Sequence, residues 1–157
     1  MATNTTLQYL ESTGEDAFGA SASLGANVSN RRQVETFIAS AAIAAGDAVA
    51  FDLSQTDDNL RSLRVLKADT GATTSKCFVG IALNPAAAEG DRVNVCLAGP
   101  CVANIGSGGG VGVPMMISTN GQLVNFDAAG DTVLMRAAHC ATVVADGQAT
   151  VIVHKQF

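Results

Sequence analysis

Apolar and polar positions alternate with a period of two along most of the chain from residue 33 onward. Val93, Val95 and Leu97 share one face of the clearest such series. Because this is the period of a β-strand, the alternation predicts short strands. They are expected at about residues 34–38, 49–51, 63–68, 77–83, 91–97, 101–105, 114–117, 122–126, 132–136, 140–144 and 149–154. Roughly ten short strands predict an all-β fold with minor α content, built as a small β-sandwich or barrel.

Tight turns separate these runs, and three of the turns share the pattern Gly-Asp-Xaa-Val. The copies lie at residues 46–49, 90–93 and 130–133. Glycine supplies a positive φ, Asp bonds nearby backbone amides, and the β-branched Val opens a strand. Asn120-Gly121 and Asp146-Gly147 are turn signals of the hairpin type. The identical setting of the three aspartates favours a shared turn function over a catalytic or metal-binding cluster.

Four segments depart from simple alternation. Residues 77–83 form a continuous apolar run, which predicts a central buried strand. Residues 54–62 are polar and predict a loop, although three leucines between residues 60 and 66 share helical spacing. Residues 84–90 carry an Asn cap, a Pro at the first helical position and a closing Gly, which predicts a one-turn helix. The glycine-rich stretch 106–112 predicts a flexible, solvent-exposed loop, because neither Gly-Lys-Ser/Thr nor a helix follows to receive a phosphate.

The first 33 residues have a different composition. They are rich in Thr, Ser, Asn, Gly and Ala, and their sparse apolar residues show no sustained period. Such a segment cannot bury enough apolar surface to fold alone. We therefore expect an extended N-terminal arm at residues 1–33 and a β-rich domain at residues 34–157. The arm either becomes ordered on a partner or is a tail without a role.

Composition and charge exclude several classes of function. The chain is 48% hydrophobic but only 15% charged, and its net charge is −5. Charged residues make up about 25% of an average soluble domain, so partners or further copies are expected to cover much of the surface. The scattered basic residues form no stripe that could follow phosphates, which argues against nucleic acid. No apolar run reaches the roughly 18 residues of a membrane span, and no signal peptide is recognisable.

The cysteines and histidines offer little chemistry. The four cysteines, at positions 77, 96, 101 and 140, are expected to stay reduced and buried as structural thiols. The separation of Cys96 and Cys101 is not that of a Cys-Xaa-Xaa-Cys site. His139 and His154 are the only two histidines, and both are expected to be surface or edge residues. No catalytic, cofactor-binding or metal-binding residue is assigned.

Five segments between about residues 34 and 155 carry a more specific signal in their order and spacing. They are Ala45–Val49 (AGDAV), Phe78–Leu83 (FVGIAL), Glu89–Val95 (EGDRVNV), Gly112–Gly121 (GVPMMISTNG) and Asp146–Val153 (DGQATVIV). In this respect the chain resembles small phage capsid decoration, or cement, proteins of the lambda gpD-like, β-tulip type. Members of that group usually carry Gly-Asp-Pro at the hairpin, where this chain has Gly112-Val113-Pro114. The departure is minor.

The resemblance implies a β-tulip-like body with an extended arm, and a non-enzymatic protein without cofactors. Such a protein docks on the outer surface of an assembled phage capsid and stabilises the head, as a homotrimer at three-fold or quasi-three-fold positions. Its partners would be the major capsid protein and its own copies, with no nucleic acid and no membrane. It would occur on the capsid exterior of the virion, and in the host cytoplasm during assembly. The expected capsid or subunit contacts are Leu7, Tyr9, Leu10, Phe18, Arg31 and Arg32.

Two other functions stay open. Tail-tube, fibre and baseplate proteins of phages also use β-rich oligomers. An enzyme, such as a small hydrolase or assembly protease that uses His139, is the alternative from a different class.

Overall fold

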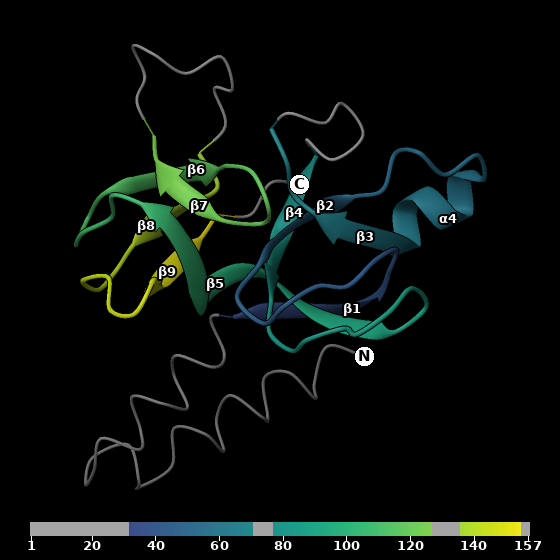
Figure 1. Ribbon diagram of the computed structural model, residues 1–157, viewed down its shortest axis with the longest axis horizontal. Helices are drawn as coiled ribbons and strands as arrows, with labels where there is room; N and C mark the ends of the chain where they lie inside the picture. The colour runs from purple at the N-terminus through teal and green to yellow at the C-terminus, as the bar shows by residue number, and fades with distance from the viewer. Residues whose placement is uncertain (1–31, 71–76, 127–135, 155–157) are drawn as a thin grey trace, which may run out of the picture.

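The computed structural model describes residues 32–70, 77–126 and 136–154, which form two β-barrels side by side (Figure 1). The elements are β1 (Gln33–Ala39), β2 (Ala48–Phe51), α4 (Asp58–Leu63), β3 (Arg64–Lys67), β4 (Phe78–Ala82), β5 (Arg92–Ser107), β6 (Pro114–Ile117), β7 (Leu123–Asn125), β8 (Ala138–Cys140) and β9 (Gln148–Val153). The predicted all-β class is confirmed, in its barrel form.

The described strands close two rings that share β5. In the first ring, β1 pairs with β3, β3 with β2, β2 with β4, β4 with β5, and β5 again with β1. In the second, β5 pairs with β7, β7 with β6, β6 with β8, β8 with β9, and β9 with β5. Closure pairs the strand edges that an open sheet would expose.

Strand β5 changes barrels at Gly99-Pro100. Residues up to Ala98 pair with β1, whereas Gly99 and the residues after it pair with β9. Gly99 has a φ of 96°, which a residue with a side chain rarely adopts. Pro100 lacks an amide hydrogen, so it suits a point where the hydrogen-bonding partner changes. The sequence predicted a break here. The structure shows a bend within one continuous strand.

Two hydrophobic clusters fill the barrels. One lies inside the first ring and includes Phe37, Val49, Val79 and Val95. The other fills the second ring and extends over Ala48, Ala50, Phe78 and Ile81, on the opposite faces of β2 and β4. Alternate residues of β2 and β4 therefore enter different clusters. This explains the continuous apolar run at residues 77–83, and the prediction of a central buried strand there is confirmed.

Both hairpin turns are confirmed. Asn120 and Gly121 have φ values of 55° and 73°, and they connect the antiparallel strands β6 and β7. Asp146 and Gly147 have φ values of 51° and 74° and precede β9. Asn and Asp tolerate this left-handed conformation better than other residues with side chains.

Two predictions of local structure were wrong in opposite directions. Residues 58–63, inside the expected loop, form helix α4, because Asp57 caps its first turn. Residues 84–90, the expected one-turn helix, contain no helix. There, Ala86 forms a bridge with Ile43, and the Asp91 carboxylate accepts the amides of Ala87 and Ala88. A carboxylate that binds these amides holds the segment as a turn.

Smaller differences concern strand ends and the third Gly-Asp copy. β8 occupies residues 138–140, so the strand predicted at 140–144 begins and ends earlier. Gly106 and Ser107 belong to β5 rather than to the glycine-rich loop. The predicted strand at 132–136, apart from Arg136, and the copy at 130–133 lie outside the described residues.

Candidate interaction site

The Gly-Asp turn at residues 46–47 anchors a network of polar contacts. The Asp47 carboxylate is buried, accepts the amide of Ala44 at 2.8 Å and lies 2.9 Å from Lys67 Nζ. Asn104 Nδ2 donates to Asp47 Oδ1 at 2.8 Å, and Gln148 Nε2 donates to Asn104 Oδ1 at 2.9 Å. These bonds tie the turn to β5 and β9. The predicted turn function of the Gly-Asp pattern is confirmed for Asp47 and Asp91.

A groove of about 280 Å³ opens beside this turn. Ala45 and Gly46 lie at the turn side, Ala82 and Leu83 follow β4, and Val102 and Gln148 come from β5 and β9. Arg32, the first described residue, completes the lining and is exposed to solvent. The groove therefore combines apolar walls with one amide and one guanidinium group.

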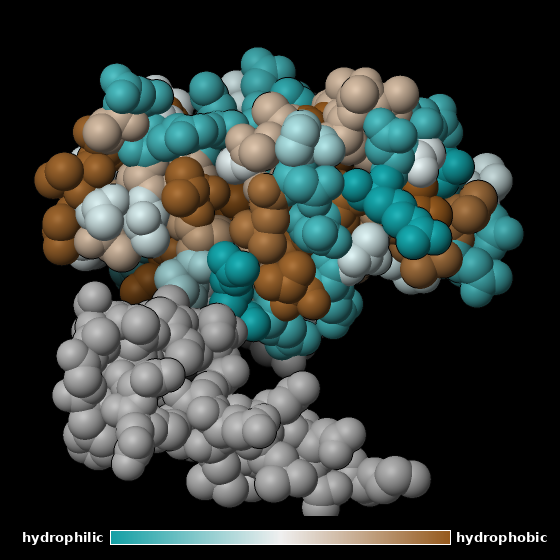
Figure 2. Space-filling view, turned by 90° about the horizontal axis from the view of Figure 1, so that it is seen from below, coloured by the Kyte–Doolittle hydropathy of each residue, from teal (hydrophilic) through white to brown (hydrophobic). Residues whose placement is uncertain are grey.

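The outer face of β5 and β9 continues the apolar surface. Pro100 pairs with Ile152 and Val102 with Thr150, so these four side chains share the outward-facing side. Val102 and Ile152 each keep 49% of their surface exposed. Outward positions of a solvated sheet are usually polar, and the described part of this face between Pro100 and Asn104 carries no charged residue. Figure 2, which views the molecule from below Figure 1, shows several groups of hydrophobic side chains in brown among hydrophilic ones.

A second apolar site lies on two loops of the second barrel. Val111 and Val143 are each 71% exposed, the highest values among the large hydrophobic side chains described. The loops are tied together, because Gly112 donates its amide to the carbonyl of Cys140 at 2.8 Å. The amide of Gly109 is also held, by Asn125 Oδ1 at 2.6 Å. The glycine-rich segment predicted as a flexible loop is thus fixed by hydrogen bonds.

The histidines, which were predicted to be surface or edge residues, form a pair. His139 Nδ1 lies 2.6 Å from His154 Nε2, and both side chains are half-buried. Burial lowers the pKa of His154, and the charges of His139 and Arg136 lower it further. Within the described ranges, no three His, Cys, Asp or Glu side chains are grouped as metal ligands.

Three of the four cysteines are buried as expected, but Cys77 is exposed. Residue 77 precedes β4 and lies outside the barrel wall. Cys96 and Cys101 share a hydrogen bond, which lowers the pKa of Cys96 and raises that of Cys101. Burial and the bond together keep the proton on Cys101.

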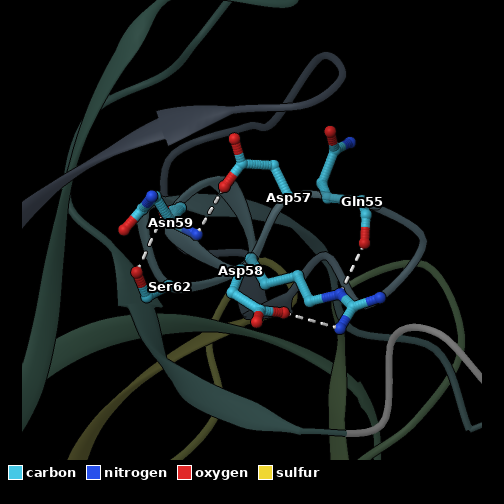
Figure 3. A network of polar contacts seen from close by, with 6 residues as sticks. Gln55, Asp57, Asp58, Asn59 and Ser62 are labelled. Carbon is cyan, nitrogen blue, oxygen red and sulfur yellow. Dashed lines mark hydrogen bonds and ion pairs between the residues drawn. The ribbon is translucent and has the colours of Figure 1, made fainter.

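Polar contacts around α4 stabilise a short helix that has no buried residue (Figure 3). Asp57 accepts the amide of Asn59 at 2.8 Å, and Ser62 Oγ donates to the Asn59 carbonyl. Arg61 bonds the Asp58 carboxylate and the Gln55 carbonyl. All these donors have local partners, so the network explains the helix without a ligand. Among the described residues, no helix has the length and apolar character of a membrane span.

Of the predicted contact residues, the structure places one. Arg32 lies at the groove, whereas the other five (Leu7, Tyr9, Leu10, Phe18 and Arg31) lie outside the described residues. Sequence reasoning missed the groove and the outer face of β5 and β9. Val102 could have been found, because it is an apolar residue on the outward phase between the buried Cys101 and Ala103.

Comparison with known proteins shows the fold. No protein-family model matches the chain, and no curated protein matches it by sequence. Among solved structures, the N base of head fiber gp8.5 in bacteriophage phi29 is similar, with a TM-score of 0.54 and 16% sequence identity. The similarity covers 79% of this chain and 95% of that one. At this identity the likeness establishes that the two chains share a fold.

Proposed function

We propose that this protein is a structural component of a phage virion, which binds the outer surface of the assembled capsid and stabilises the shell. It acts as a homotrimer at three-fold or quasi-three-fold positions, and its N-terminal arm adds contacts to the major capsid protein. It performs no catalysis, requires no cofactor and binds neither nucleic acid nor membrane.

The observation that carries the proposal is the shared fold with the base of a phage head fiber. The likeness spans 95% of that base, which its name assigns to a fiber on a phage head. The order of turn motifs in the sequence resembles phage decoration proteins independently of this comparison. Both lines of support point to the phage head.

The surface of the described residues suits protein partners. Exposed Val102 and Ile152 form an apolar face, and Val111 and Val143 form an apolar loop pair. Uncharged surfaces of this kind favour association with protein. Three subunits joined as a trimer would also bind a shell at three points, which raises the overall affinity well above that of one contact.

Binding to empty shells tests the proposal. Purified protein is mixed with capsids assembled without it, and the bound fraction is measured by co-sedimentation. We expect saturable binding at a fixed ratio of protein to capsid subunits, and saturated shells should resist heat better than undecorated shells. Absence of binding would contradict the proposal.

Truncation tests the role of the arm. A variant lacking residues 1–30 is expected to keep its folded body and to bind the same shells more weakly. Circular dichroism checks the fold. The full-length chain with Leu53→Ala, in the loop between β2 and α4, serves as a matched control. Equal binding of truncated and intact protein would remove the arm from the proposal.

The base of a head-attached fibre is the second candidate, favoured by the name of the similar structure. The two functions differ in position, because a cement protein covers the shell lattice whereas a fibre base occupies attachment points. Images of virions that carry labelled protein distinguish them. A hexameric ring in native mass measurements would instead favour a tail tube.

An enzyme that uses His139 is the candidate from a different class. Replacing His139 with Ala is expected to leave capsid binding intact, which is the result for a structural protein. A hydrolytic activity that disappears in this variant would favour the enzyme.

A further inference from the structure

The groove at Arg32 is too small for a folded partner and suits one or two large side chains. Its volume of about 280 Å³ lies at the lower limit of small-molecule sites, which measure roughly 300–1,000 Å³. Leu83 and Val102 supply apolar walls, and Val102 also belongs to the exposed apolar face with Ile152. An occupant must therefore carry apolar side chains.

The charge at the groove adds a second requirement. Arg32 is exposed, and no acidic side chain among the described residues forms an ion pair with it. An occupant with a carboxylate beside its apolar residues would complement this guanidinium group.

A segment in the first 31 residues of the chain has both properties. Leu7-Gln8-Tyr9-Leu10-Glu11 holds three large apolar residues next to a carboxylate. The body begins at Arg32, on the groove itself, so this segment is tethered beside its candidate site. Charge complementarity and the point where the chain leaves the body thus favour the same occupant.

The length of the tether favours the segment of the same copy. About 20 residues separate Glu11 from Arg32, and a linker of that length rich in Gly and Ser has an average end-to-end distance of about 25 Å. Such a tether gives an effective concentration in the millimolar range. At micromolar protein, a copy that is free in solution would compete poorly for the groove.

We infer that in the free protein residues 7–11 bind the groove of their own chain, with Leu10 against Val102 and Leu83 and Glu11 against Arg32. The inference goes beyond the proposed function, because it concerns the protein before any shell is present. The bound arm would then shield the apolar face of Val102 and Ile152. A partner must displace the arm before it can bind that face or the arm itself.

Cross-linking tests the position of the segment. In a Cys77→Ser background, Leu10→Cys and Val102→Cys are combined in one chain and oxidised with a mild copper catalyst. We expect a disulfide within the chain, seen as loss of two thiols at monomeric mass on a non-reducing gel. The matched control pairs Leu10→Cys with Leu63→Cys, an exposed position at the end of α4, which contributes none of the described groove residues, and it should cross-link at least tenfold more slowly. Equal rates, or cross-links between chains, would overturn the inference.

Charge exchange provides a second measurement. Glu11→Arg and Arg32→Glu are each expected to slow the cross-link severalfold, and the double variant is expected to restore it. Failure of the double variant to recover would contradict the proposed ion pair. Neither readout needs a capsid. The cross-link can therefore form even if the protein does not bind shells, and the protein can bind shells even if the cross-link does not form.

Discussion

His139 Nδ1 lies 2.6 Å from His154 Nε2, and the two rings stack with centroids 4.6 Å apart. A contact this short holds one hydrogen atom between the two nitrogens. Protonation of both rings would place two N–H groups against each other. Arg136, which also lies over the ring of Phe126, adds a further positive charge nearby. The pair therefore favours the neutral form of His154.

Mild acid is expected to destabilise the protein through this pair. Because the pKa of His154 is lowered in the folded state, the unfolded chain binds the proton at higher pH. The free energy of unfolding should be highest above the ordinary histidine pKa of 6.5 and should fall as the pH drops through that value. Urea titrations between about pH 8 and about pH 5 measure the slope. His154→Gln should flatten it, and an unchanged slope would assign the effect to other groups.

Asp52 should stabilise the folded protein down to a much lower pH than the histidine pair does. Burial raises the pKa of its carboxyl, but hydrogen bonds led by those from Ser54 and Gln55 outweigh burial and lower it from 3.8 to about 2. The stabilisation is therefore present above pH 3.8 and is lost between 3.8 and about 2. Asp52→Ala should lower the free energy of unfolding at neutral pH by about 1–3 kcal/mol, because Ser54 and Gln55 lose hydrogen bonds to a charged acceptor. Ser62→Ala on the exposed α4 is the control, and equal losses in the two variants would refute the assignment.

Gly80 should tolerate no side chain. A Cβ at this position would lie 2.2 Å from the backbone carbonyl oxygen of Cys96 and 2.8 Å from the side-chain atom Val95 Cγ1, both on the shared strand β5. Gly80→Ala should therefore lower the free energy of unfolding by about 3 kcal/mol or more. Gly110→Ala is the matched control, because its nearest contact would be an ordinary 3.6 Å. Chemical denaturation compares them, and similar stabilities would show that β4 and β5 can separate.

Two copies of one turn motif should differ in their contribution to stability. Asp47 is buried and bonds Asn104 and Lys67 across the fold, whereas Asp91 is exposed and bonds only local amides. Asp47→Ala should cost about 2–3 kcal/mol and Asp91→Ala about 1 kcal/mol. Thermal unfolding of both variants measures the difference. A larger loss for Asp91→Ala would contradict the role given to the buried network.

Local signals in the sequence predicted the strands and turns well. Alternation and turn residues such as Asn120-Gly121 determine the conformation of only a few neighbouring residues. Predictions based on them therefore hold in the folded protein. Where two local signals competed, the prediction was wrong, as at residues 84–90, where the Asp91 carboxylate takes the amides that a helix would use. Helix α4 was missed because it has no buried face, and therefore no apolar stripe.

The ring closures and the groove could not be predicted from local patterns. β1 meets β5 and β5 meets β9 through pairings between residues more than forty positions apart. The groove needs Arg32, Leu83, Val102 and Gln148 to converge from four parts of the chain. Arg32 was predicted as a contact without any of these neighbours.

The strand shared by both barrels makes them mechanically and thermodynamically inseparable. A force applied to one ring passes along the covalent backbone of β5 into the other, without crossing a weak interface. Melting either ring would remove hydrogen-bonding partners from β5 and expose residues of the other ring's wall. Calorimetry should accordingly record one cooperative transition for the body, and a fragment that ends at Gly99 should be unable to fold as half of it.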